Sequence, residues 1–188
     1  MKNLICVSAP SGSGKTTLCK AIRKLRPDLV WSVSCTTRGP RHDEVDGEDY
    51  HFKTKEEFLV MIDKGEFAEW ENVHGNYYGT LKSKLNDSIK KNETVLLELD
   101  VKGTTAIQEL YPHHSYSIFI IPPSINHLRS RLKSRGSETD ETIEKRLKRF
   151  DIEMKHKDKF DTLLINDNIE VAIKDFIAKV NYITKGVH

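Results

Sequence analysis

The chain has 188 residues, of which 37% are hydrophobic and 31% charged, and its formal net charge at pH 7 is +2. This composition excludes a disordered chain, and the length fits one compact domain that buries a sizeable core. The nearly balanced charge favours neither nucleic acid nor an acidic partner, and no apolar run approaches the roughly 18 residues of a membrane span.

The three cysteines, Cys6, Cys19 and Cys35, are odd in number and lack the spacing of metal ligands. They predict reduced thiols, with Cys6 and Cys19 in the core and none acting as a nucleophile. The N-terminus leads straight into a strand pattern without the features of a signal peptide. We therefore expect a cytoplasmic protein with neither a membrane nor a nucleic-acid partner.

The first predicted strand is the apolar run Leu4 to Val7, and a helical pattern runs from Leu18 to Leu25. Between them, residues 9–16 read Ala-Pro-Ser-Gly-Ser-Gly-Lys-Thr. In such a strand, turn and helix, backbone N–H groups and the positive helix end point at one anion. The lysine then reaches the outer phosphates and the threonine ligates Mg²⁺. The pattern predicts a nucleoside triphosphate site rather than an ordinary Gly/Ser turn.

One position departs from the strict phosphate-loop pattern, which has glycine where this chain has Ala9. Alanine costs little there if φ is negative, whereas a positive φ would require the loop to shift.

The stretch from Val30 to Leu81 contains short alternating segments and turn residues, including Gly39-Pro40 and Asp46-Gly47. A capping box at residues 54–57 predicts one short helix within it. We interpret the stretch as a small, mostly β insertion, with the lobe at about residues 33–81.

Two arginines of this lobe, Arg38 and Arg41, lie three positions apart in a loop rich in hydroxyl side chains. Their guanidinium groups can together bind a phosphate through bidentate hydrogen bonds. Taken alone, the pair would fit two solvated arginines. Tyr50 and Tyr78 favour the phosphate site, because tyrosine hydroxyls can donate to phosphate and the rings can line a nucleotide.

Glu69 offers a carboxylate that can accept hydrogen bonds from N1–H and the exocyclic N2–H₂ of guanine. Adenine has an acceptor at N1 and cannot satisfy that carboxylate. Without Tyr78 and Thr80 nearby, a surface glutamate on an edge strand would be the simpler interpretation. With Tyr78 and Thr80 present, we predict that Glu69 selects guanine over adenine.

The rest of the chain alternates between buried strands and helices. Strands are predicted from Val95 to Leu99, Tyr116 to Ile121 and Leu163 to Ile165. Helices are expected from Ser124 to about Arg135, from Asp140 to about Lys157 and from Asn168 to about Tyr182.

The fold class is therefore α/β: a phosphate-loop core of about five parallel strands flanked by helices, a small β-rich lobe and a helical lid. We expect a single domain over residues 1–188, with the core at 1–32 and 82–188 and the lid at about 126–158. The sequence does not predict the strand order.

Seven segments, in order along essentially the whole chain, resemble the guanylate kinase family. They are residues 11–17, 34–41, 47–52, 75–80, 99–103, 131–136 and 165–168. The phosphate loop alone would indicate only nucleotide binding, whereas the full set is specific. The resemblance implies an ATP:GMP phosphotransferase that makes ADP and GDP, with ATP as co-substrate and Mg²⁺ as cofactor.

The resemblance also implies roles for individual residues. It places the GMP phosphate on Arg38, Arg41, Tyr50 and Tyr78, and guanine on Glu69 and Thr80 with Ser34 and Asp100 close by. It places ATP over Ser11, Gly12, Ser13, Gly14, Lys15, Thr16 and Thr17, with adenine near Asn166 and Asp167 and Mg²⁺ on Thr16.

Arginines are concentrated in the predicted lid. Arg131 and Arg135 share a face of one predicted helix, and Arg146 lies on the next. A solvated basic face is the alternative, but the resemblance implies that these three close over the triphosphate. Together with Lys15 and Arg41 they would supply positive charge for phosphoryl transfer. The acceptor phosphate is already largely deprotonated, so no general base is needed.

Two alternatives stay open. One is a guanylate-kinase-like module that has lost catalysis and binds a protein, but such a module would be expected to lose Lys15 or the lid arginines, which are present. The other is a kinase for AMP or dTMP, against which Glu69 with Thr80 argues. We infer no obligatory protein partner. Lys102 stands where the family usually has glutamine, which adds a charge near the acceptor site.

Overall fold

The computed structural model describes residues 2–10, 12–73, 75–134 and 140–184. Its core is a five-stranded sheet in the order β2-β7-β1-β8-β9, in which every neighbouring pair is parallel. The strands are β1 (Leu4–Ser8), β2 (Val30–Trp31), β7 (Val95–Glu98), β8 (Ser115–Ile121) and β9 (Thr162–Ile165). The prediction of about five parallel strands is confirmed, although the two-residue β2 is too short to form an apolar run.

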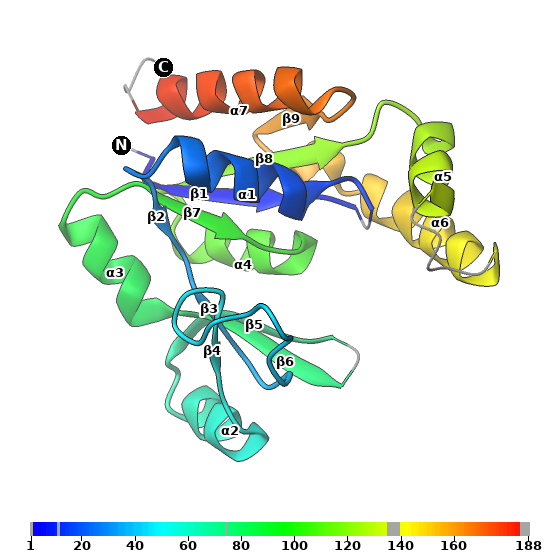
Figure 1. Cartoon of the computed structure of the whole chain (residues 1–188). Helices are drawn as coiled ribbons and strands as arrows, with labels where there is room; N and C mark the ends of the chain where they lie inside the picture. Colours follow the sequence, from blue (N-terminus) through cyan, green and yellow to red (C-terminus); the bar gives the residue numbers. More distant parts are fainter. Residues whose placement is uncertain (1, 11, 74, 135–139, 185–188) are drawn as a thin grey trace.

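Helices cover both faces of this sheet (Figure 1). On one face, α1 (Lys15–Leu25) and α7 (Ile169–Thr184) pack with Ile5 and Val7. On the other face, α3 (Lys82–Lys90) and α4 (Val101–Leu110) pack with Leu4 and Cys6. Double coverage explains why the strands are apolar on both sides.

The three cysteines are buried free thiols. Cys6 and Cys19 lie in the core as predicted, and Cys35 packs with Phe58 and Phe67 in the lobe. Burial raises the pKa of each thiol, so the reactive thiolate is disfavoured at neutral pH. The thiols therefore act as packing residues.

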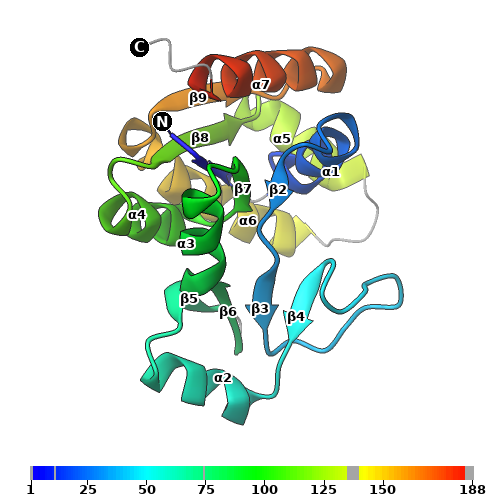
Figure 2. The same ribbon diagram turned by 90° about the vertical axis from the view of Figure 1, so that its left-hand side faces the viewer.

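A second sheet, in the order β4-β3-β6-β5, lies below the core in Figures 1 and 2. Its strands are β3 (Ser34–Thr36), β4 (Tyr50–Phe52), β5 (Phe67–Val73) and β6 (Asn76–Leu81). The β3–β4 pair is parallel and the other two pairs are antiparallel. α2 (Lys55–Asp63) starts at the predicted capping box of Thr54 and Glu57 and packs Phe58 onto the small sheet.

A pair of helices, α5 (Ile125–Ser134) and α6 (Asp140–Met154), stands beside the core (Figure 1). Leu128 and Leu132 of α5 bury against Ile143 and Leu147 of α6. The turn η1 (Lys157–Lys159) then leads towards β9. Within the described ranges, no helix is both long enough and apolar enough to cross a membrane.

Candidate functional site

The loop between β1 and α1 has the backbone of a phosphate loop. Gly12 and Gly14 have φ values of 87° and 86°, and Gly14 is the N-cap of α1. No acidic residue lies in the first turn of α1, so the positive helix end is available to an anion. Ala9 is not among the described residues with positive φ, so alanine fits this position without a shift of the loop.

Asn166, which follows β9, supports this loop. Its side-chain amide nitrogen donates a hydrogen bond to the carbonyl oxygen of Ser13 at 2.8 Å, and the residue is buried. A β-carbon added at Gly14 would overlap the same nitrogen, so close packing as well as φ requires glycine there. The contact of Asn166 with adenine, like that of the exposed Asp167, stays a prediction.

Glu98, at the end of β7, is a site residue that the sequence motifs did not identify. Its Oε1 accepts a hydrogen bond from Oγ1 of Thr16 at 2.9 Å and lies 3.9 Å from Nζ of Lys15. Lys15 also donates to the carbonyl oxygen of Leu99 at 2.7 Å. The available signal was a lone carboxylate in an apolar strand pattern, at the edge of the sheet where α/β proteins bind ligands.

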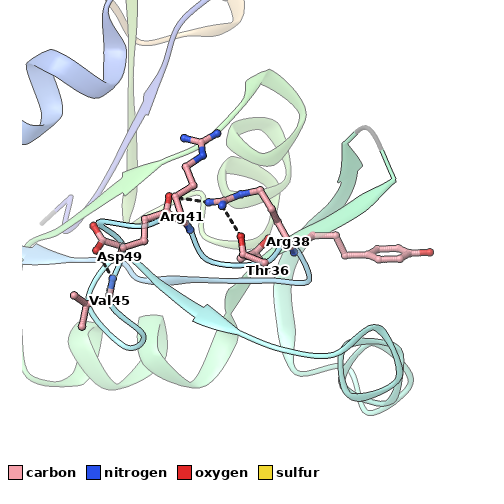
Figure 3. Close-up of polar contacts among 8 residues, drawn as sticks. Thr36, Arg38, Arg41, Val45 and Asp49 are labelled. Atoms are coloured by element: carbon pink, nitrogen blue, oxygen red, sulfur yellow. Dashed lines mark hydrogen bonds and ion pairs between the residues drawn. The ribbon is translucent and has the colours of Figure 1, made fainter.

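The loop between β3 and β4, which carries Arg38 and Arg41, is held by hydrogen bonds from its own backbone (Figure 3). Oγ1 of Thr36 accepts the backbone N–H of Arg38 at 3.2 Å, and the Asp49 carboxylate accepts that of Val45 at 2.9 Å. Arg38 and Arg41 therefore project from a loop whose backbone is fixed at both ends.

Glu44 holds the side chain of Arg38 and the backbone of Arg41. One carboxylate oxygen accepts from Nη2 of Arg38 at 2.8 Å, and the other accepts from the backbone N–H of Arg41 at 2.9 Å. Arg38 also donates to the carbonyl oxygen of Gly39 and lies over the ring of Tyr50, 5.4 Å from its centroid. The hydrogen bond with Glu44 raises the pKa of Arg38 further, so its positive charge is permanent.

Tyr50 and Tyr78 lie side by side, with ring centroids 6.1 Å apart in an edge-to-face arrangement. Burial raises the pKa of Tyr50, which keeps its hydroxyl protonated and able to donate at neutral pH. The structure thus brings the predicted phosphate-binding side chains together around one loop.

Glu69 faces Thr80 across the β5–β6 pair, and Oγ1 of Thr80 donates to Oε1 of Glu69 at 2.5 Å. Burial raises the pKa of Glu69 to about 7, although the hydrogen bond from Thr80 opposes the rise. The nearby Asp100 carboxylate raises it further. The hydroxyl fixes the rotation of a half-buried carboxyl group, and the contact of this group with guanine stays a prediction.

Lys102 does not leave an unbalanced charge near the acceptor site. Its Nζ donates to Oε1 of Glu71 at 3.0 Å, which joins the first turn of α4 to β5. This departure from the family pattern therefore adds an ion pair between the core and the lobe. The lysine is largely exposed, so the pair adds little to stability.

One cavity of about 430 Å³ joins the two groups of predicted residues. It is lined by Lys15 and Thr16 of α1, by Arg41, Tyr50, Glu69 and Tyr78 of the lobe, and by Ser34, Glu98 and Asp100. Arg38 and Thr80 contact two of these lining residues, Tyr50 and Glu69. The predicted triphosphate and acceptor groups therefore face each other across one space.

Of the three predicted lid arginines, the structure describes the side chain of Arg146. Arg146 is half-buried on α6 and is not among the described residues that line the cavity. Arg131 belongs to α5, but its side chain lies outside the described part of the chain, as do Ser11 and Arg135. Closure of these arginines over the triphosphate stays a prediction.

A phosphate loop after the central strand of a parallel sheet, with an acceptor site across the same cavity, defines a P-loop kinase. The crystal structure of guanylate kinase from Anaplasma phagocytophilum matches with a TM-score of 0.80 and 32% identity, covering 99% of this chain and 88% of that one. Shikimate kinase from Bacteroides thetaiotaomicron shares the fold at a TM-score of 0.53 and 16% identity, with 95% and 98% covered.

The chain belongs to the guanylate kinase family, whose model matches residues 1–181. The guanylate kinase of Carboxydothermus hydrogenoformans is 42% identical over 175 residues, which is 93% of this chain and 85% of that protein. That of Clostridium perfringens strain SM101 is 44% identical over 171 residues, 91% of this chain and 79% of that protein. The family suggested by the seven segments is confirmed.

Proposed function

We propose that this cavity carries the guanylate kinase reaction, in which the γ-phosphoryl group of ATP passes to GMP and leaves ADP and GDP. The shared cavity carries the proposal, because Lys15 and Thr16 face Arg41 and Glu69 across it. Two nucleotides held on its opposite sides bring the donor and acceptor phosphates together, which is the main task in phosphoryl transfer.

On the acceptor side, Arg38, Arg41, Tyr50 and Tyr78 bind the phosphate of GMP. Glu44 need not be displaced, because a guanidinium group carries five N–H donors and Glu44 and Gly39 each accept one from Arg38.

The base is read at the other end of the acceptor site. Glu69 accepts from N1–H and the N2 amino group of guanine, with Thr80 fixing the carboxylate and Ser34 and Asp100 close by. Adenine has an acceptor at N1, so the Glu69 carboxylate would keep its hydrogen bond from Thr80 but gain none from that position of the base, which disfavours AMP.

On the donor side, the phosphate loop from Ser11 to Thr17 binds the triphosphate through backbone N–H groups and the Lys15 ammonium. Adenine lies near Asn166 and Asp167. The acceptor phosphate carries about −1.5 to −2 charges at pH 7, so it attacks without a general base. Lys15 and Arg41 offset the repulsion between the two nucleotides as the phosphates approach.

The residues near Lys15 also fit a bound Mg²⁺. Thr16 and Glu98 provide a hydroxyl and a carboxylate 2.9 Å apart, which are oxygen donors of the kind that Mg²⁺ prefers beside substrate phosphates. When bound, Mg²⁺ neutralises charge on the β- and γ-phosphates of ATP. Thr16 is the residue to which we assign direct binding.

We further propose that the lobe, at about residues 33–81, and the lid, at about 126–158, close on the core at 1–32 and 82–188. Closure would bring Arg131, Arg135 and Arg146 to the triphosphate and exclude water that would otherwise hydrolyse ATP. The reaction needs only small-molecule substrates, so we assign the enzyme to the cytoplasm with no obligatory protein partner.

GMP binding is expected to strengthen as pH rises through about 7. Only ionised Glu69 accepts both guanine donors, and burial raises its pKa to about 7 in the GMP-free protein. Bound guanine lowers the pKa of Glu69. At pH values below about 7, GMP binding therefore releases a proton, and the affinity for GMP falls by up to about tenfold for each pH unit. The carboxylates of Asp100, the N-cap of α4, and Glu71 on β5 also raise the pKa of Glu69, whereas the hydrogen bonds of Thr80 lower it.

Calorimetric titration with GMP between about pH 6 and pH 8 checks this dependence. The GMP phosphate itself titrates near pH 6, so the matched control is Glu69→Gln, which keeps the phosphate step and should lose the step near pH 7. Identical pH profiles for the two proteins would show that Glu69 does not set the dependence.

The proposed reaction is tested by ADP production with ATP and Mg²⁺ in the presence of GMP, AMP, dTMP or no acceptor. We expect ADP production that requires GMP and an equal amount of GDP. ADP production without any acceptor would indicate an ATPase. Equal turnover of AMP and GMP would contradict guanine recognition. If no ADP forms with any acceptor, the result would favour a binding module.

A further inference from the structure

Gly103, the third residue of α4, is a glycine that the fold itself does not require. Most glycines in the described part of the chain have a positive φ, and Gly79 has no room for a side chain beside the ring of Phe67. The backbone conformation of Gly103 does not explain its glycine: its φ is not positive, and it lies inside a helix, where alanine is ordinarily more stable than glycine. Something else must account for glycine here.

The space that a side chain would take at Gly103 is occupied by Glu69. A β-carbon built on Gly103 would lie 2.9 Å from Oε2 of Glu69 and 3.3 Å from its carboxyl carbon. It would also lie 3.3 Å from Oδ1 of Asp100, the N-cap residue whose carboxylate accepts the N–H of Gly103 at 2.7 Å. The near contacts are thus with two carboxylates that line the cavity.

We infer that Gly103 is a positioning residue for guanine recognition: its missing side chain lets the Glu69 carboxylate lie against the first turn of α4. This rests on the proposed role of Glu69 as the reader of guanine. The Thr80 hydroxyl holds Oε1 of Glu69, while Oε2 takes the space that a side chain at Gly103 would fill.

The arrangement joins the lobe to the core at the base-reading group. Glu69 and Thr80 belong to the lobe strands β5 and β6, whereas Gly103 belongs to α4 of the core, which packs on β5 and is capped by Asp100. Guanine is therefore recognised where β5 of the lobe packs against α4 of the core.

The direct test is Gly103→Ala. The atom that a new methyl group meets most closely is the end of a flexible side chain, so Glu69 should turn away while the helix stays intact. We expect the KM for GMP to rise about tenfold or more, because hydrogen bonds to a charged acceptor are lost. The KM for ATP should stay close to the original, and the melting temperature should be unchanged or higher.

Thr105→Ala is the matched control on the same helix. Its hydroxyl donates to the carbonyl oxygen of Val101 within α4, so its removal changes the helix without changing the space beside Glu69. This variant should keep the GMP KM of the original protein.

A second pair of variants separates positioning from a structural effect. In a Glu69→Ala background, adding Gly103→Ala should change the GMP KM no further, because the group that Gly103 positions is already absent. A further loss there would overturn the inference. So would a Gly103→Ala protein with a lower melting temperature, or one with an unchanged GMP KM.

These outcomes are distinct from failure of the proposed function. If the original protein does not phosphorylate GMP, or if Glu69→Ala leaves the GMP KM unchanged, the proposed role of Glu69 is wrong. If Glu69→Ala raises the GMP KM but Gly103→Ala does not, the role of Glu69 stands and only the inference about Gly103 is contradicted.

Discussion

Replacing Lys15 with alanine is expected to lower kcat for GMP phosphorylation by about 10²- to 10³-fold. The ammonium lies at the N-terminal end of α1, between the carbonyl oxygen of Leu99 and the carboxylate of Glu98. From there it can reach the outer phosphates of ATP, where negative charge must be stabilised during transfer. Steady-state rates with saturating GMP and ATP measure the loss, and thermal unfolding followed by circular dichroism should show an intact fold.

Lys24→Ala is the matched control for this prediction. Lys24 lies in the last turn of the same helix and is exposed, so its removal changes the charge of α1 away from the cavity. Its kcat should stay near that of the original protein. A Lys15→Ala enzyme with a near-original kcat would mean that the loop does not hold the transferred phosphate.

The second large effect is expected from Glu69→Gln, which should raise the KM for GMP by about 10- to 100-fold and reduce the preference for GMP over AMP. The amide keeps the size of the side chain but replaces an acceptor oxygen with a donor that opposes the guanine N–H groups. The KM for ATP should change little, because Glu69 lies on the lobe side of the cavity. Initial rates with varied GMP and AMP give both quantities.

Glu71→Gln provides the control on the same strand. Its carboxylate lines the same cavity but pairs with the largely exposed Lys102 on α4, so its loss should alter the GMP KM far less. If Glu69→Gln still discriminates between GMP and AMP as the original protein does, another group reads the base.

The parallel core could be predicted because a strand that is buried on both faces consists almost entirely of apolar residues. The runs Leu4 to Val7 and Val95 to Leu99 are almost wholly apolar, and they match the strands β1 and β7 to within one residue. The two residues of β2 are too few to form a recognisable apolar run. Strand order could not be predicted either, because apolar runs do not specify their partners; the structure places β1, which leads into the phosphate loop, at the centre.

The site could be predicted where a short motif carries the chemistry, and less well where the chemistry depends on contacts distant in the sequence. The phosphate loop is local, and Lys15 and Thr16 line the cavity as the motif suggests. Glu98 approaches Thr16 across 82 positions of sequence, so no local pattern links them. The pairing of Lys102 with Glu71 joins α4 to β5 in the same way, which is why the lysine suggested only an added charge.

The most direct measurement is a crystal structure of the protein with GMP and a non-hydrolysable ATP analogue. We expect the guanine N1 and N2 atoms within hydrogen-bond distance of Glu69, the GMP phosphate against Arg38 and Arg41, and the triphosphate along the loop that ends at Lys15. GMP bound with its base away from Glu69, or a triphosphate outside this loop, would contradict the account of how one cavity joins the two nucleotides.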